Sequence, residues 1–244
     1  MDEIIKLGGI LDFTTVDWPG KIASIVFLYG CNFKCPYCFN SDLVIGNNFK
    51  EIEISKIVAL LKSNKDFVDS VVICGGEPTI HGEKLVKLCS LLKESGFKIK
   101  LDTNGSNPEL VEKLIKNKLI DFVALDIKSD FQEKNYERAS GGFTDMQKIK
   151  NTLNILINSN IEYECRIPVI PNLNQHLIKN IAKEITQAKT VVLEQYISSD
   201  KTIDKNFKII NSPSREELIN LAKFFKNEIV KIRTKEMGEE ILTS

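Results

Sequence analysis

The chain has 244 residues, of which 43% are hydrophobic and 27% charged, with 33 Lys and Arg balanced against 33 Asp and Glu. This length suits one domain, and the balance leaves no net field that would draw the chain to nucleic acid or to an anionic membrane. The longest apolar stretch, residues 22–29, is far too short to cross a bilayer, and the N-terminus lacks the apolar region of a secretory signal. We therefore expect a cytoplasmic protein with neither a membrane nor a nucleic-acid partner.

Strand-like and helix-like segments alternate along the chain. Apolar runs predict strands at 22–29, 70–74, 97–101, 122–127, 163–169, 190–195 and 229–234. Apolar stripes of helical spacing predict helices at 52–63, 83–95, 108–117, 146–159, 174–189 and 215–228. This alternation predicts a parallel sheet with right-handed crossovers, with fewer units than the roughly eight of a full barrel. The predicted fold is α/β, an incomplete (β/α)6-type TIM barrel.

The chain is predicted to form one domain over residues 1–244, with a core at about 20–200 and a C-terminal extension at 201–244. Two polar stretches, 128–144 and 200–211, interrupt the alternation. We expect the first to be a mobile loop, and either could serve as a lid or face a partner.

Three of the six cysteines lie within eight residues, directly after the first predicted strand. They are Cys31, Cys35 and Cys38, in a C-x3-C-x2-C pattern. Soft thiolates at this spacing suit an iron–sulfur cluster, and the missing fourth thiolate would leave one iron open to a substrate. The other three cysteines stand alone in apolar segments, which is typical of packing residues. The trio is therefore the candidate metal site.

Zinc and accidental clustering are the competing interpretations of the trio. A structural zinc site needs four ligands, so three cysteines would have to recruit a histidine. The two histidines, His81 and His176, are not at ligand spacing from the cysteines. The pattern therefore favours a cluster with an open iron.

Polar residues are also expected at the ends of three later strands. Gly75, Gly76 and Glu77 end the strand at 70–74; the glycines would let the backbone approach a ligand closely, and Glu77 offers a carboxylate. Asp102 and Asp126 end the next two strands, where barrel sites gather, although a lone Asp there could equally be a helix cap or lie in a solvated turn.

The cysteine pattern, with the aromatic Tyr37 before its last cysteine, resembles that of the radical S-adenosylmethionine superfamily. Supporting segments are G-G-E-P at 75–78, D-T-N-G at 102–105, D-I-K at 126–128 and T-V-D-W-P-G at 15–20. Together they are similar to the glycyl-radical-enzyme activases, and the Trp form is similar to the activating proteins of anaerobic ribonucleotide reductase. The resemblance covers roughly residues 8–200.

The resemblance implies a 4Fe–4S cluster on the three cysteines and S-adenosylmethionine as its substrate. It places the methionine amine at Gly75, Gly76 and Glu77 and the methionine carboxylate at Lys128. It also implies a monovalent cation held with the help of Asp102, Thr103 and Asp126. The resemblance also assigns four further residues to the cofactor-binding set, namely Tyr37, Phe39, Asn40 and Arg166.

Two departures from the activase pattern concern histidine. The usual C-H-N is replaced here by Cys38-Phe39-Asn40, and the histidine expected near the last strand falls at about Ile197. Arg166, on a predicted strand, could take over a carboxylate contact or form a salt bridge at the barrel rim. Cleavage of S-adenosylmethionine is still expected despite these departures. They concern the identity of the substrate that receives the radical.

The leading hypothesis is therefore an enzyme that generates a glycyl radical on an anaerobic partner enzyme, with a flavodoxin or ferredoxin as electron donor. The alternative is a small-molecule radical enzyme, such as one that forms a deazapurine precursor. A third class, a non-catalytic zinc or binding protein, would need the cysteine loop to be structural.

Overall fold

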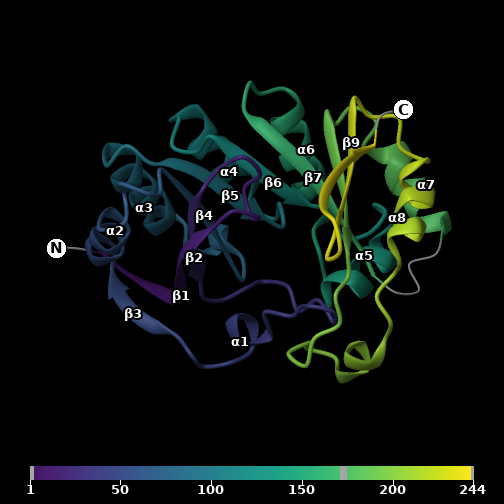
Figure 1. Ribbon diagram of the computed structural model, residues 1–244, viewed down its shortest axis with the longest axis horizontal. Helices are drawn as coiled ribbons and strands as arrows, with labels where there is room; N and C mark the ends of the chain where they lie inside the picture. The colour runs from purple at the N-terminus through teal and green to yellow at the C-terminus, as the bar shows by residue number, and fades with distance from the viewer. Residues whose placement is uncertain (1–2, 171–174, 243–244) are drawn as a thin grey trace.

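A single ten-stranded sheet organises the part of the chain that the computed structural model describes, residues 3–170 and 175–242. The strand order is β10-β9-β8-β7-β6-β5-β4-β2-β1-β3 (Figure 1). The parallel strands are β2 (Ala23–Leu28), β4 (Ser70–Gly75), β5 (Lys98–Thr103), β6 (Phe122–Asp126), β7 (Glu162–Val169), β8 (Thr190–Gln195) and β9 (Ile229–Thr234). The antiparallel strands at the two edges are β1 (Ile4–Thr14), β3 (Lys50–Glu53) and β10 (Gly238–Leu242).

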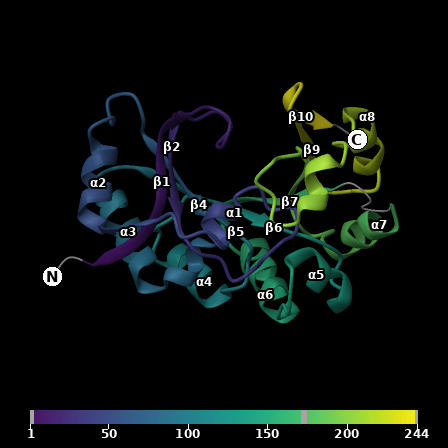
Figure 2. The same cartoon turned by 90° about the horizontal axis from the view of Figure 1, so that it is seen from below.

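Helices cover the outer face of this curved sheet, and its inner face stays open between β1 and β10 (Figure 2). The α-helices are α1 (Ser41–Val44), α2 (Ile54–Lys62), α3 (Glu83–Glu94), α4 (Pro108–Lys116), α5 (Glu133–Ser140), α6 (Met146–Ile157), α7 (Gln175–Glu184) and α8 (Arg215–Ala222). The short 3-10 helices are η1 (Pro78–His81) and η2 (Lys205–Ile209). The sheet does not close on itself, so the predicted incomplete barrel is confirmed. Among the described residues, no helix has the length and apolar character that crossing a membrane requires.

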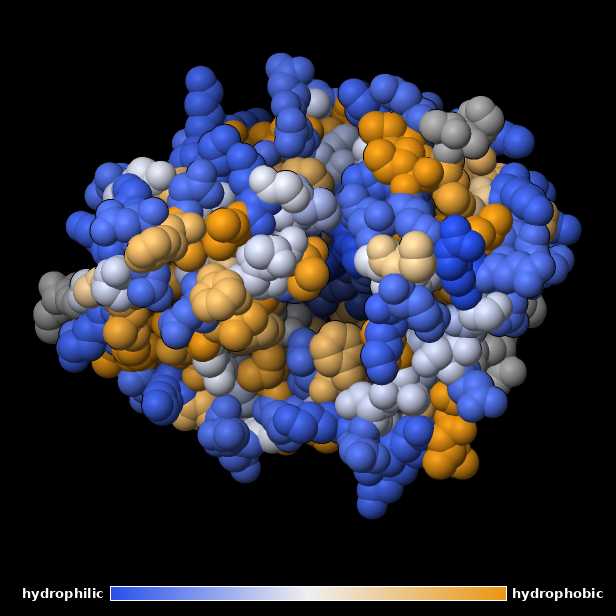
Figure 3. Space-filling model, in the orientation of Figure 1, coloured by the Kyte–Doolittle hydropathy of each residue, from blue (hydrophilic) through white to orange (hydrophobic). Residues whose placement is uncertain are grey.

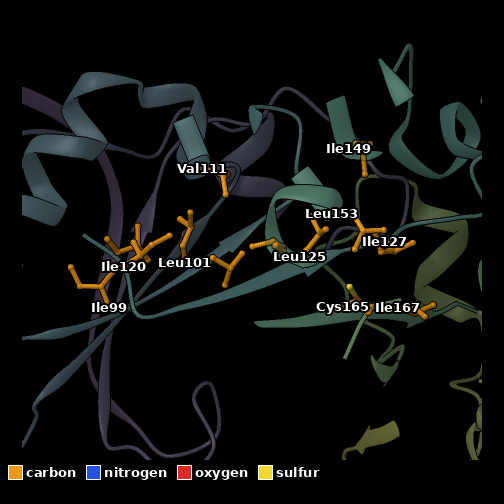
Figure 4. Packing of buried hydrophobic residues seen from close by; sticks show 14 of the residues in the cluster. Ile99, Leu101, Val111, Ile120, Leu125, Ile127, Ile149, Leu153, Cys165 and Ile167 are labelled. Atoms are coloured by element: carbon orange, nitrogen blue, oxygen red, sulfur yellow. The ribbon is translucent and has the colours of Figure 1, made fainter. Parts of the chain in front are cut away.

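The main core lies between the sheet and these helices. Ile99 and Leu101 of β5, Leu125 of β6 and Cys165 of β7 point toward α4 and α6 and are fully buried (Figure 4). Helix α4 shows how the sequence places a helix there, because the Asn107 side chain accepts the Leu110 N–H and a proline occupies the first turn. One face of each strand is thereby buried, and the other is left for the barrel interior.

The alternating elements predicted from the sequence are present, and several others were missed. The expected start of the helix at 174–189 falls on Asn174, outside the described residues. The missed elements are the strands β1, β3 and β10, the helices α1 and α5, and the 3-10 helices η1 and η2. Strand β10 is polar and is paired with β9 through cross-strand ion pairs, Lys231 to Glu239 at 2.8 Å and Arg233 to Glu239 at 2.6 Å. Because β9 and β10 lie within 201–244, this C-terminal segment continues the barrel sheet.

The two polar stretches predicted as a lid or partner-facing loops both pack against the cysteine loop, residues 30–40. Residues 128–144 contain α5, and the Lys34 N–H donates to the Ser140 carbonyl at 2.8 Å. Residues 200–211 contain η2, and the Asp204 N–H donates to the Pro36 carbonyl at 2.9 Å. Polarity misled the prediction here, because backbone hydrogen bonds hold these segments in place and need no apolar side chains.

Gly141 makes the contact with α5 possible. This residue ends α5 at φ +78°, and a Cβ there would lie 2.0 Å from the Lys34 carbonyl oxygen. The neighbouring Gly142 has no such restriction, because a Cβ there would meet nothing within 4 Å.

We predict that Gly141→Ala lowers the free energy of unfolding by about 1–2 kcal/mol or more, since a side chain in the left-handed region is strained and this one also clashes. Urea denaturation of the two alanine variants measures the difference. Gly142→Ala is the matched control and should leave the midpoint nearly unchanged. Equal midpoints for the two variants would contradict the contact between α5 and the cysteine loop.

Candidate active site

The residues singled out in the sequence gather at one end of the sheet. They follow or end β2, β4, β5, β6 and β7, which are parallel neighbours. Since the carboxyl ends of parallel strands meet at the same edge, side chains that are far apart in the sequence share one region.

The cysteine loop begins directly after β2, and its three thiols are free. Cys35 is buried, and Cys31 and Cys38 are half-buried. Burial raises the pKa of the Cys31 thiol to about 12 and also raises those of Cys35 and Cys38, while the nearby Lys128 ammonium lowers all three. Without a bound metal these thiols are neutral, so loading of a metal centre must release their protons.

The donor set of this loop fits a soft-metal centre. Three free thiols lie on one short loop, and the Tyr37 hydroxyl is buried with no hydrogen-bond partner among the described residues. No three His, Cys, Asp or Glu side chains of the described chain are gathered tightly enough to hold a single metal ion. A cubane cluster makes a different demand, because each thiolate binds a different iron.

Gly75 and Gly76 bring the end of β4 against the start of the cysteine loop. A Cβ on Gly76 would lie 2.0 Å from the Gly30 carbonyl oxygen, and one on Gly75 would lie 2.2 Å from the Leu28 carbonyl oxygen. The Glu77 N–H donates to the Gly30 carbonyl at 2.8 Å. In the structure, these glycines therefore allow the backbone at the end of β4 to approach the backbone of β2 and of the cysteine loop.

Glu77 is fully buried, and both of its carboxylate oxygens accept hydrogen bonds from the chain. Thr79 donates its hydroxyl at 2.6 Å and its N–H at 3.0 Å to one oxygen, and the Thr103 hydroxyl donates to the same oxygen at 2.7 Å. The Asn104 N–H donates to the other oxygen at 2.7 Å. Burial raises the pKa of Glu77, and these hydrogen bonds only partly offset it. The structure thus places Thr103 on Glu77, where it ties the end of β5 to the end of β4.

Asn104 and Asn32 make a further link, which was not predicted from the sequence. The Asn104 amide donates to the Asn32 side-chain oxygen at 2.9 Å, and the Asn32 amide donates to the Ser106 hydroxyl at 2.9 Å. The cysteine loop is therefore attached to the end of β5 as well as to β4, α5 and the η2 segment.

Arg166 on β7 bridges the two acids that end β5 and β6. Its guanidinium donates to Asp102 Oδ2 at 2.9 Å and to Asp126 Oδ1 at 3.0 Å, and Lys128 Nζ lies 3.2 Å from Asp126 Oδ2. Burial raises the pKa of Asp126, but Lys128 and Arg166 outweigh this effect, so the net pKa lies below its ordinary value. Asp126 is therefore ionised at neutral pH. Of the two roles considered for Arg166 from the sequence, the structure shows the salt bridge.

The charged network extends across the inner face of the sheet to residues that the sequence motifs did not single out. Lys100 Nζ lies 3.6 Å from Asp102 and 3.7 Å from Glu164, and Arg233 of β9 reaches Glu164 at 3.5 Å. Lys100 and Glu164 are almost fully buried. The sequence spacing could have identified both residues. Lys100 stands two residues before Asp102, and Glu164 stands two residues before Arg166, so each pair lies on one face of its strand.

The other half of the inner face is apolar. Trp18 packs with Ala23, Ile25 and Val72, and its ring centroid lies 6.0 Å from that of Phe122. The segment at 15–20 therefore lies against the inner face, with the Asp17 carbonyl accepting from Lys100 Nζ. Figure 3 shows a hollow near the middle of this open side, with hydrophobic side chains gathered on the side of β1 and β2.

The remaining candidates lie at the edge of this region. Phe39 is 61% exposed, and the Asn40 carbonyl accepts the Leu43 N–H at the start of α1. Ile197, at the position expected for a histidine, is 45% exposed. Of the isolated cysteines, Cys89 and Cys165 are fully buried in the main core, and Cys74 packs beside the Trp18 cluster.

An open α/β barrel with a three-cysteine loop at the carboxyl ends of its strands defines a class of metal-cluster enzymes. A family model described as the Radical SAM superfamily matches residues 25–185. The chain belongs to this superfamily, and membership implies a 4Fe–4S cluster and S-adenosylmethionine.

Two relatives align over nearly the whole chain. A provisionally named glycyl-radical enzyme activating enzyme of Methanocaldococcus jannaschii is 37% identical over 237 residues, 93% of this chain and 95% of that protein. The pyruvate formate-lyase-activating enzyme of Clostridium pasteurianum is 28% identical over 240 residues, 91% of this chain and 97% of that protein.

Solved structures share the fold at lower identity. TYW1 with a lysine-pyruvate adduct superposes with a TM-score of 0.66 at 19% identity, covering 88% of this chain and 77% of that one. Streptococcus suis SuiB bound to S-adenosylmethionine superposes with a TM-score of 0.64 at 19% identity, covering 82% of this chain and 47% of that one.

We predict that Arg166→Ala lowers the free energy of unfolding at pH 7 by about 3–5 kcal/mol, because two carboxylates lose their shared buried partner. The lowered pKa of Asp126 stabilises the fold above the ordinary aspartate pKa of about 3.9, and this contribution disappears as the pH falls below it. The deficit of the variant should therefore be fully present above about pH 5 and shrink as the pH falls from about 5 to about 3. Urea denaturation across this range, with the exposed Arg138→Ala as control, measures it. A deficit that is independent of pH would contradict the assignment.

Proposed function

We propose that this enzyme reductively cleaves S-adenosylmethionine and uses the resulting 5′-deoxyadenosyl radical to generate a glycyl radical on a partner enzyme. The observation that carries this proposal is the 37% identity, over 93% of the chain, to a relative named as a glycyl-radical enzyme activating enzyme. An anaerobic ribonucleotide reductase is the partner that the T-V-D-W-P-G segment favours.

We propose that Cys31, Cys35 and Cys38 hold three irons of the cluster and leave the fourth to S-adenosylmethionine. When bound, the cluster supplies one electron that splits the sulfonium into methionine and the 5′-deoxyadenosyl radical. That radical takes a hydrogen atom from a glycine Cα–H of the partner, giving 5′-deoxyadenosine and the glycyl radical. The chain's own contribution is to hold these groups in position and to exclude water.

Several residues would orient the methionine part of the substrate. Lys128 lies near the three thiols and provides an ammonium for the methionine carboxylate. Since the Glu77 carboxylate already accepts four hydrogen bonds, we propose that the 75–77 segment offers the methionine amine its backbone oxygens. The unpartnered Tyr37 hydroxyl, Phe39 and Asn40 complete the proposed cofactor-binding set.

The open side of the barrel suits a protein substrate. A small substrate would leave the hollow on the open side (Figure 3) exposed to water, whereas a loop of a partner protein can cover it. The electron would come from a flavodoxin or ferredoxin, and exposed Phe39 and Lys34 place the cysteine loop within reach of such a donor at the surface. We infer a cytoplasmic location because the free thiols must be kept reduced.

A monovalent cation is a further part of the proposal. Asp102 Oδ1 is buried and accepts no hydrogen bond among the described residues, and the Lys100 ammonium lies 3.6 Å from it. Arg166 occupies the other oxygen of this carboxylate, so a cation could bind Asp102 without displacing the guanidinium. It would sit beside the place proposed for the methionine carboxylate and add positive charge there.

We predict that the reconstituted enzyme, mixed anaerobically with a reductant, S-adenosylmethionine and the ribonucleotide reductase of the same organism, produces the doublet of a glycyl radical in electron paramagnetic resonance. Cys35→Ala should abolish the doublet, the brown absorbance of the cluster and the release of 5′-deoxyadenosine, because an iron loses its thiolate. Cys89→Ala, which changes a buried packing residue of helix α3, should retain all three.

Two outcomes would count against this function. Release of 5′-deoxyadenosine without a doublet on any glycyl radical enzyme of the organism would favour a small-molecule substrate. Retention of the absorbance and of turnover in Cys35→Ala would remove the cluster assignment.

For the cation, we predict that replacing potassium and sodium by tetramethylammonium weakens binding of S-adenosylmethionine about tenfold, which corresponds to about 1.4 kcal/mol. Equilibrium dialysis of the cluster-loaded enzyme measures the Kd, and Asp102→Asn should show the weak Kd in every salt. An identical Kd in all salts for the unaltered enzyme would mean that Arg166, Lys128 and Lys100 balance the two acids without a bound cation.

A further inference from the structure

A second cavity lies at the opposite end of the barrel from the candidate active site. It has a volume of about 1320 Å³ and is bordered by the connection from β1 to β2, the starts of β5 and β7, and the turns that precede β6 and β7. These turns project at the upper edge of the molecule in Figure 1, and hydrophilic side chains project from the same edge in Figure 3. Since β5 spans six residues, about 17 Å separates its two ends.

The charge on this cavity is not balanced by its own residues. Its lysines are Lys21, Lys93, Lys98, Lys116 and Lys118. Lys93 is paired with Asp121 at 2.8 Å, and Lys116 with Glu112 at 2.7 Å. For Lys21, Lys98 and Lys118 the described residues provide no partner, and Glu162 is the remaining acid of the lining. Three unpaired ammonium groups thus face a single unpaired carboxylate, which favours an anionic ligand.

The rest of the lining is apolar and amide-rich. Ile115, Ile155 and Ile161 are half-buried, so each still exposes aliphatic surface to the cavity. Asn154, Asn158 and Asn160 add amide donors and acceptors beside them. An aliphatic surface with neutral hydrogen-bonding groups suits a flat heterocycle, whereas the lysines suit phosphates.

Lys118 adds a conformational observation. It is the one non-glycine residue of the described chain with a positive φ, +54°, in the turn between α4 and β6. Glycine adopts this conformation without strain, whereas a lysine there costs on the order of 1 kcal/mol. The left-handed conformation ends α4, because the Leu119 N–H donates to the Leu114 carbonyl at 2.9 Å, and the Lys118 side chain lines the cavity.

We propose that this cavity binds a nucleoside polyphosphate, with Lys21, Lys98 and Lys118 contacting the phosphates and the isoleucine surface contacting the base. The volume exceeds the range of about 300–1,000 Å³ that is common for small-molecule sites, so a nucleotide fits with bound water. The site is separate from that of S-adenosylmethionine and does not depend on the proposed activase function.

Equilibrium dialysis of labelled ATP against the cluster-loaded enzyme, with S-adenosylmethionine in excess to fill its own site, tests the proposal. We expect saturable binding that weakens at least about tenfold in Lys98→Ala/Lys118→Gly. The matched control is Lys62→Ala/Lys87→Ala, which removes two exposed lysines from α2 and α3 and should leave the Kd unchanged. Absence of saturable binding, or an equal loss in both double variants, would overturn the proposal.

Two further measurements separate this site from non-specific attraction of anions. Inorganic tripolyphosphate should bind clearly more weakly than ATP, and equal affinities would overturn the nucleotide assignment. Lys118→Gly alone should raise the unfolding midpoint, since strain is relieved, and still weaken ATP binding. A variant that is more stable and binds ATP normally would show that Lys118 does not contact the ligand.

Discussion

The arrangement of the candidate active site depends on one close approach of two backbones, that of Gly76 to the Gly30 carbonyl. No side chain fits between them, since a Cβ on Gly76 would lie 2.0 Å from that oxygen. The contact aligns the end of β4 with the start of the cysteine loop, and the Glu77 N–H completes it. A loop of irregular backbone needs such contacts, because its polar groups must find partners outside regular structure.

Three further contacts fix other positions of the cysteine loop. Ser140 holds Lys34, Asp204 holds Pro36, and Asn104 holds Asn32. These partners come from segments that follow β6, β8 and β5, so the loop joins several units of the barrel. These four attachments fix the position of the cysteine loop relative to the sheet.

Charge on the inner face imposes a second constraint. Arg166 bridges Asp102 and Asp126, and Lys100 and Arg233 approach Glu164. Removing any one of these groups would leave an opposite charge buried, so the network is costly to alter one residue at a time. It also fixes the carboxylates beside the place proposed for the methionine part of the substrate. The basic cavity at the other end of the strands is a separate feature, with its own unpaired lysines.

The sequence alone determined the barrel class and the cysteine centre, for reasons of local chemistry. Apolar runs of strand length and apolar stripes of helical spacing can be recognised without knowledge of tertiary contacts. The same holds for a C-x3-C-x2-C pattern after a strand. Tertiary structure alone decided the pairing of Arg166 with both acids, the burial of Glu77 by Thr103 and the role of Gly76. Each of these joins residues from different strands, and their distances depend on the register of the sheet. Polar composition likewise gave no sign of α5 or β10, because hydrogen bonds and ion pairs to neighbouring segments stabilise them.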